Sequence, residues 1–303
     1  MPFHVQVVGD DSGTKGTGTH LAIGGLMAPA TVWASFTDAW NVCLTEYPRV
    51  DYCKLAEAAK RIGPFAGFSE KRRNGKLVAL ARTIASFPFV ALTATINLAD
   101  QHVDRPEDQQ RRKLKKWEKN AGYVTRTLLH PYYEARTYFI LAATIHLWRG
   151  GVREQFDLIF DEHRSLGKRT TDTYPALRYL LPEDMRSIMP NAQIERDDRT
   201  FLPLQAADMI AGLRRIEAEG DTSMSWLGAE FRSLVHSHHS VSADAAWYRE
   251  MQRRFQEHGP PASLAESLSE LSRLLGPVPP DGAITPALVS SFLPWSPFPP
   301  ERK

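Results

Sequence analysis

Three aspartates lie in or beside segments that are otherwise apolar, and their placement restricts the possible folds of this chain more than any other feature. Asp10 follows the run FHVQVVG, Asp161 follows FDLIF, and Asp208 lies inside LPLQAADMIAGL. The first two runs have the composition of buried strands, and the third is apolar on nearly every face of a helix. A buried carboxylate without a cation costs several kcal/mol. We therefore expect all three to converge on bound metal or on basic side chains.

The composition predicts a globular protein with a substantial core. The chain has 303 residues, of which 43% are hydrophobic, and its length favours one large domain. No stretch approaches the roughly 20 apolar residues of a membrane-spanning helix, and the start MPFHVQVVG lacks the features of a signal peptide. We therefore expect a cytoplasmic protein without membrane contact. Cys43 and Cys53 lack metal-ligand spacing and are predicted to be reduced structural residues.

Two segments carry an excess of positive charge, although the net charge of the chain is only +2. Residues 105–119 hold seven Lys or Arg and three Asp or Glu, a net charge of +4. Residues 60–76 hold six and one, a net charge of +5. Such segments can bind nucleic-acid phosphates, and they can equally be solvated helix faces. In the first segment, Arg112 and Lys116 are the candidate phosphate contacts.

Apolar patterns predict five strands separated by helices. Strands are expected at 3–9, 20–27, 89–98, 155–160 and 191–197. The first two form an antiparallel hairpin, and a basic Gly/Pro loop is expected at 61–76. Helices are expected at 31–60, 77–86, 106–120, 131–148 and 171–185, and from Pro203 onward. This order of elements indicates a mixed α/β fold.

The domain organisation follows from the same patterns. Residues 1–220 form the predicted principal domain, with a helical insertion at about 31–86. Residues 221–276 are predicted to form a helical C-terminal extension. Residues 277–303 contain eight prolines and no helical period, which predicts an extended or disordered tail.

Carboxylates at strand ends and on an apolar helix suit two-metal phosphoryl transfer. In that chemistry two Mg²⁺ or Mn²⁺ ions, about 3.5–4 Å apart, are held by carboxylates from several elements. Each motif also has a structural interpretation. DDSG is common in turns, Asp161 can cap a following helix, and Asp208 can belong to a buried ion pair.

Four signatures occur in order within residues 3–217. They are a first strand ending in DDSG, a second apolar strand, an apolar strand ending in Asp161, and a late helix with LQAADMIAG. Together they resemble the uncharacterised prokaryotic DUF3800 family. The resemblance implies a ribonuclease-H-like fold, a mixed five-stranded sheet flanked by helices, with acidic positions at Asp10, Asp161 and Asp208. It also implies a nuclease site. Asp11 stands where the family usually has Glu.

The resemblance and the metal chemistry together assign roles to individual residues. Asp10 would bridge two metal ions, Asp161 and Asp208 would each hold one, and Asp11 and Glu162 are additional candidate ligands. Candidate substrate contacts are Ser12 for a phosphate, Gln205 for orienting Asp208 or a water, and His163, Lys168 and Arg169 for the scissile phosphate.

Other interpretations remain open. Gly13, Gly16 and Gly18 resemble the first phosphate loop of actin-like sugar kinases and chaperone ATPases, which makes an ATP-dependent phosphotransferase the main alternative. The sequence contains neither a second such loop nor a Gly-Lys-Ser/Thr motif. A third interpretation is a non-catalytic nucleic-acid-binding or defence-associated protein whose carboxylates pair with arginines. A weak zinc candidate is formed by His236, His238 and His239.

Overall fold

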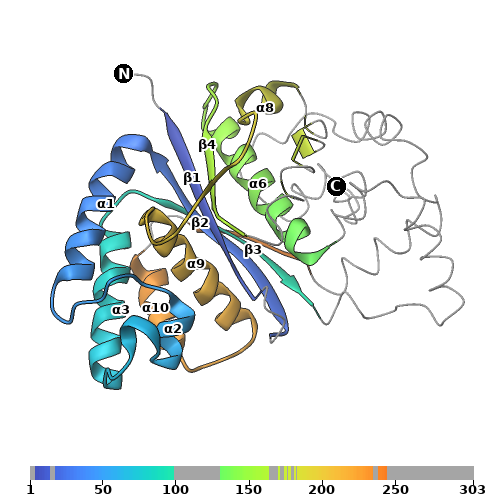
Figure 1. The fold of residues 1–303 in the computed structure, drawn as a ribbon. Helices are drawn as coiled ribbons and strands as arrows, with labels where there is room; N and C mark the ends of the chain where they lie inside the picture. Colours follow the sequence, from blue (N-terminus) through green and yellow to red (C-terminus); the bar gives the residue numbers. More distant parts are fainter. Residues whose placement is uncertain are drawn as a thin grey trace, which may run out of the picture. The chain divides into compact units, whose positions relative to one another are not determined.

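Six strands form one open, mixed sheet in the order β5-β4-β1-β2-β3-β6 (Figure 1). The strands are β1 (Val5–Ser12), β2 (His20–Pro29), β3 (Val90–Asn97), β4 (Asp157–Asp161), β5 (Ile194–Arg196) and β6 (His238–Ala243). β1 pairs antiparallel with β2 and parallel with β4, and β4 pairs parallel with β5. The predicted mixed α/β fold with helices flanking the sheet is confirmed. β6 is an additional strand, in a segment that was expected to belong to the helical C-terminal extension.

The computed structural model describes residues 4–13, 18–98, 130–163, 170, 174–175, 177–178, 181, 183–234 and 238–243. The chain divides into two compact units. One unit comprises Met1–Thr95, Gln155–His163 and Gln193–Ser240, and the rest of the chain belongs to the other. The predicted helix at 106–120 and the predicted tail at 277–303 lie outside the described residues.

Helices gather on one side of β1 and β2 within the first unit (Figure 1). They are α1 (Ala30–Thr45), α2 (Leu55–Lys60), α3 (Glu70–Ala85), α9 (Pro203–Ala218) and α10 (Ser225–Leu234), with a 3-10 turn, η1 (Gly63–Phe65), between α2 and α3. The helical insertion between β2 and β3 is thus confirmed. The side chain of Ser69 caps α3 by accepting a hydrogen bond from the Arg72 N–H, and Pro203 lies in the first turn of α9.

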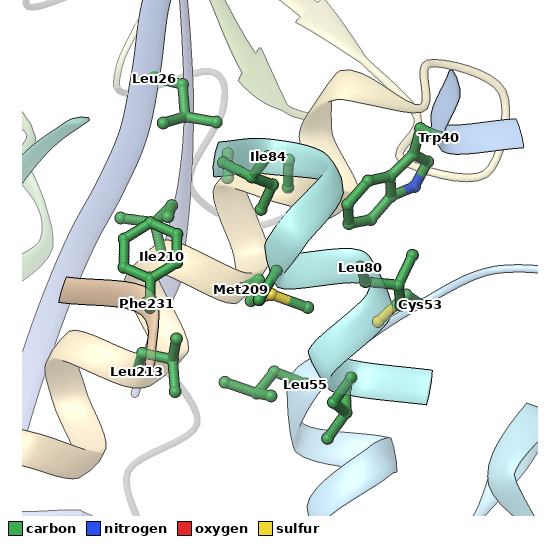
Figure 2. Close-up of a cluster of buried hydrophobic side chains, with 14 of the residues drawn as sticks. Leu26, Trp40, Cys53, Leu55, Leu80, Ile84, Met209, Ile210, Leu213 and Phe231 are labelled. Carbon is green, nitrogen blue, oxygen red and sulfur yellow. The ribbon is translucent and has the colours of Figure 1, made fainter. Parts of the chain in front are cut away.

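The core of this unit joins the helices to the sheet. The register places Leu26, Val8, Ile159 and Ile194 in one row across β2, β1, β4 and β5, and all four contribute to the core. Figure 2 shows helix side chains that pack with this row, among them Trp40, Leu80, Met209 and Phe231. Phe231 lies on α10, which packs on α3 and α9. The predicted domain boundary at residue 220 is therefore wrong, because α10 completes the same core.

The region from 31 to 76 differs from its predicted form. The expected helix 31–60 breaks after Thr45, where Pro48 prevents helical continuation. α3 begins at Glu70, so the second half of the expected basic loop is helical. Lys76 is buried and donates to the carbonyls of Cys43, Leu44 and Glu46 at the end of α1. This lysine therefore caps a helix and does not face a ligand phosphate.

The second unit contains α6 (Pro131–Arg149) and α8 (Glu183–Ile188), which pack on each other. α6 begins at Pro131 as predicted, and the His130 side chain accepts from the Tyr132 N–H. Nearly all of its residues are buried. The predicted single helix at 171–185 is wrong in extent, because α8 begins at Glu183 and only short helical pieces precede it among the described residues.

Gly24→Ala tests the contact between α9 and the sheet. A Cβ at Gly24 would lie 2.6 Å from Ala211 Cα and 2.9 Å from the Ile210 carbonyl carbon, both backbone atoms that cannot rotate away. We expect a loss of about 1–3 kcal/mol in the free energy of unfolding, measured with urea. Gly75→Ala is the matched control, because nothing lies within 4 Å of its Cβ position in α3. It should stabilise by about 0.5–1 kcal/mol. Equal effects of both changes would contradict the close approach.

Candidate functional site

A row of polar residues crosses the ends of three strands on the face that α9 covers. Asp161 pairs with Arg196 across β4 and β5. Asp10 adjoins Asp161 because the residues that precede them, Gly9 and Phe160, are paired. Side chains alternate along a strand, so this row lies on the same face as the apolar row two residues earlier. The ends of β1, β4 and β5 therefore place two carboxylates on one face of the sheet, with the Arg196 side chain starting beside them.

Helix α9 adds a third carboxylate to this row. Gly24 lies opposite Asp10 in the β1–β2 register, and the backbone of Ala211 rests against it. Asp208 precedes Ala211 by three residues and so lies on the same face of the helix. The close packing at Gly24 thus brings Asp208 to the end of β1.

Burial and neighbouring negative charges raise the pKa values of the three predicted acids. Burial is the largest cause: it raises the pKa of Asp208 to about 7, that of Asp161 to about 6, and that of Asp10 well above its ordinary value. The pKa of Asp10 is raised further by the charges of Asp11, Asp208 and Asp161. Hydrogen bonds act in the opposite direction, with donors 2.7 Å away: Asp11 N–H to Asp10 Oδ1 and Leu55 N–H to Asp208 Oδ2.

Two further charged residues, Lys54 and Asp198, adjoin Asp10, Asp161 and Asp208. We call these five residues the carboxylate cluster. Lys54 Nζ lies 2.6 Å from Asp198 Oδ2, and the exposed fractions of the two side chains are 34% and 7%. Burial lowers the pKa of Lys54, but its hydrogen bond and charge interaction with Asp198, and the charges of Asp10 and Asp161, raise it overall. Sequence analysis missed both residues, because Lys54 falls inside the expected helix 31–60 and Asp198 lies in the polar stretch RDDRT.

Gln205 fixes the position of Lys54 and Asp198. Its Oε1 accepts from the Cys53 N–H at 3.0 Å and from Trp40 Nε1 at 3.1 Å, and its Nε2 donates to the Asp198 carbonyl at 2.9 Å. The residue is fully buried. Gln205 was predicted to contact substrate or orient Asp208. The structure corrects this, since its amide is occupied by these three bonds in the core.

The remaining predicted residues take varied positions. Ser12 Oγ accepts from Arg215 Nε at 3.0 Å, so its hydroxyl contacts a side chain of α9. Glu162 is exposed at the end of β4, where its N–H donates to the Arg196 carbonyl at 2.9 Å. His163 is partly exposed. The other candidate phosphate contacts lie outside the described residues: Arg112, Lys116, Lys168 and Arg169.

The donor set suits a hard divalent cation in its chemistry. Aspartate oxygens are the ligands that Mg²⁺ and Mn²⁺ prefer, and buried carboxylates that repel one another favour a cation. Across the described ranges, however, no three His, Cys, Asp or Glu side chains are already arranged around one metal position. Metal binding therefore requires the carboxylates to turn toward the ion, and the metal site stays a prediction. The side chains of His236, His238 and His239 lie outside the described set.

Comparisons with protein-family models, with curated proteins and with solved structures found no match. The DUF3800 resemblance, and the ribonuclease-H-like fold that it implies, therefore stay predictions. Among helices in the described part of the chain, none is long and apolar enough to cross a membrane.

The raised pKa values predict that the metal-free protein becomes more stable as the pH falls. The ordinary pKa of these carboxyls is 3.8, and in the folded state those of Asp161 and Asp208 are about 6 and about 7. Between these limits the folded state binds more protons than the unfolded state, so stability is lost as the pH rises through the window. Urea unfolding in EDTA at several pH values measures this. A double variant, Asp10→Asn with Asp208→Asn, should show a flatter dependence, and an equal slope in both proteins would contradict the cluster.

Lys54→Met should destabilise the folded protein by about 1–3 kcal/mol, because it leaves the Asp198 carboxylate buried without its cation. Adding Asp198→Asn to this variant removes the unpaired charge and should recover most of the loss. Urea unfolding of the wild type, both single variants and the double variant gives the coupling energy. Strict additivity of the two single effects would show that the pair contributes nothing.

Proposed function

We propose that this protein is a divalent-metal-dependent nuclease with a ribonuclease-H-like fold that hydrolyses nucleic-acid phosphodiesters. The observation that supports it most directly is the convergence of Asp10, Asp161 and Asp208 from β1, β4 and α9. These elements are far apart in sequence, yet their carboxylates meet on one face of the sheet and raise the pKa of Asp10 together. Groups with strongly shifted pKa values cluster at functional sites.

The arrangement of strands is consistent with the proposed fold. β1 lies inside the sheet, antiparallel to β2 on one side and parallel to β4 on the other. Adjacent parallel strands end at the same edge, which places Asp10 and Asp161 next to each other without any loop. The fold that the family resemblance implies needs this kind of mixed sheet.

The charges of the cluster favour an added cation. Lys54 is paired with Asp198. Asp10, Asp161 and Asp208 form no ion pair with any described residue, so the interpretation in which they pair with arginines gains no support. A divalent ion would offset this repulsion, and Mg²⁺ or Mn²⁺ is the proposed cofactor.

Asp10, Asp161 and Asp208 would hold the ion or ions, with Asp10 as the predicted bridging ligand. A bound ion supplies an activated water and stabilises charge on the phosphate. The Leu55 N–H occupies Oδ2 of Asp208, so the other oxygen is the one that the side chain would turn toward the ion. Lys54 contributes a fixed positive charge beside the carboxylates.

The phosphotransferase alternative finds no support in the described residues of the loop between β1 and β2, Gly13, Gly18 and Thr19. A Cβ at Gly18 would meet the carboxylate of Glu219, and Gly13 lies against the His20 carbonyl and the Arg215 side chain. A carboxylate at this position opposes phosphate binding. Gly16 lies outside the described residues.

Divalent metal and carboxamide substitutions test the proposed function. Mn²⁺ or Mg²⁺ should raise the melting temperature of the wild type and support cleavage of DNA or RNA oligonucleotides. Asp10→Asn and Asp208→Asn each keep the side-chain shape and should abolish cleavage, while the metal-free proteins remain at least as stable as the wild type. Asp157→Asn is the control, because Asp157 lies at the opposite end of β4 and contacts Gln6. It should cleave normally.

Marked destabilisation by Asp208→Asn, with no response of the wild type to metal, would contradict the proposal. In that case the bond from the Leu55 N–H would be the main role of Asp208.

A further inference from the structure

Two exposed arginines lie beside the carboxylate cluster. Arg196 is the strand partner of Asp161, so its side chain leaves the sheet on the same face as that carboxylate. Its Nη1 donates to the Glu195 carbonyl at 3.1 Å. Arg199 follows Asp198, and its guanidinium lies 5.3 Å from the centre of the Tyr52 ring. Neither residue was singled out by the sequence analysis.

The segment that carries Arg199 is held in place by its backbone. The Arg199 N–H donates to Asp197 Oδ1 and the Phe201 N–H to the Asp197 carbonyl, both at 2.9 Å. The Asp198 carbonyl is bound by Gln205. These bonds place Asp198 inside the protein and Arg199 outside, so the position of Arg199 is tied to the cluster.

Among the described residues, no acidic side chain forms an ion pair with either arginine. Other arginines of the same unit are ion-paired with glutamates, as in Arg82 with Glu230 and Arg214 with Glu217. Within the described residues, Arg196 and Arg199 have no carboxylate within ion-pair distance. Asp198 is the acid next to Arg199 in sequence, and Lys54 already neutralises it.

We propose that Arg196 and Arg199 bind phosphates of a nucleic-acid strand at the edge of the carboxylate cluster. This assignment rests on the proposed nuclease function and names how the substrate is held. A guanidinium can donate two parallel hydrogen bonds to one phosphate, and an exposed guanidinium without a carboxylate partner keeps donors available for this.

The electrostatics of the site explain why such contacts are needed. Carboxylates that bind metal also repel the polyanionic strand, so the phosphates beside the scissile one need positive partners at fixed positions. The basic segment at 60–76 supplies fewer of these than its composition indicates, because Arg73 and Lys76 are buried. Arg196 and Arg199 lie at the cluster itself.

Oligonucleotide binding in Ca²⁺ tests the assignment. Ca²⁺ accepts the same oxygen ligands, and gel analysis of the recovered oligonucleotide confirms that it stays intact. Short, labelled single-stranded DNA, single-stranded RNA and duplex DNA are titrated with the wild type and with the double variant Arg196→Gln, Arg199→Gln, by fluorescence anisotropy. The variant should bind at least one of them about tenfold or more weakly. Its salt dependence should be shallower by about 0.7–0.9 per lost contact.

The control removes two charges elsewhere in the same unit. Arg49→Gln with Arg82→Gln changes the net charge equally, and both arginines are exposed. It should bind with the affinity and salt dependence of the wild type. Melting curves and Mn²⁺ titrations of all proteins should coincide, which separates loss of phosphate contacts from loss of fold or of metal. The two single arginine variants are measured as well, and each should show part of the effect.

The outcomes separate this proposal from the nuclease proposal. Wild-type affinity and salt slope in the Arg196/Arg199 variant, or equal weakening in the control, would overturn the phosphate-binding role. The nuclease function would still stand if the wild type binds Mn²⁺ and cleaves while Asp10→Asn does not. A wild type that neither binds Mn²⁺ nor cleaves would overturn the nuclease function itself.

Discussion

The arrangement of the site depends on one backbone contact, in which α9 rests on β2 at Gly24. Ala211 occupies the space that a side chain at Gly24 would fill. Because Gly24 is the strand partner of Asp10, the closest approach of helix and sheet falls beside a buried carboxylate. Asp208 reaches the cluster for this reason. Further along β1 and α9, Arg215 Nε donates a hydrogen bond to Ser12 Oγ.

The second constraint is the hydrogen bonding between α9 and the start of α2. Gln205 and Asp208, three residues apart on one helix, accept the N–H groups of Cys53 and Leu55. These are the residues on either side of Lys54. Helix α9 therefore sets the position of the one lysine paired within the cluster, although that lysine comes from a distant part of the chain. Lys54 and the aspartates of the cluster are therefore held together by α9.

Sequence predicted the features of this arrangement that are local in the chain and missed those that arise only on folding. The strands and the three acids were found because an apolar run, and a charge that interrupts it, are both local features. Asp198 lies in a polar stretch of the sequence and Lys54 inside an expected helix, so neither stood out, and the two meet only in the folded chain. The break after Thr45 was missed, although Pro48 marks it, because apolar residues resume at Val50 and Cys53. β6 was missed because its sequence, HHSVSA, has few apolar residues.

The hydrogen bond between the Leu55 N–H and Asp208 Oδ2 links the charge of the site to a backbone amide. The chemical shift of an amide proton depends on the charge of its hydrogen-bond acceptor. Protonation of Asp208 and metal binding to Asp208 would therefore each change the chemical shift of the Leu55 amide, by different amounts. The first residue of α2 is therefore a natural spectroscopic probe inside the cluster. It records the state of Asp208 without any added label and without any substrate.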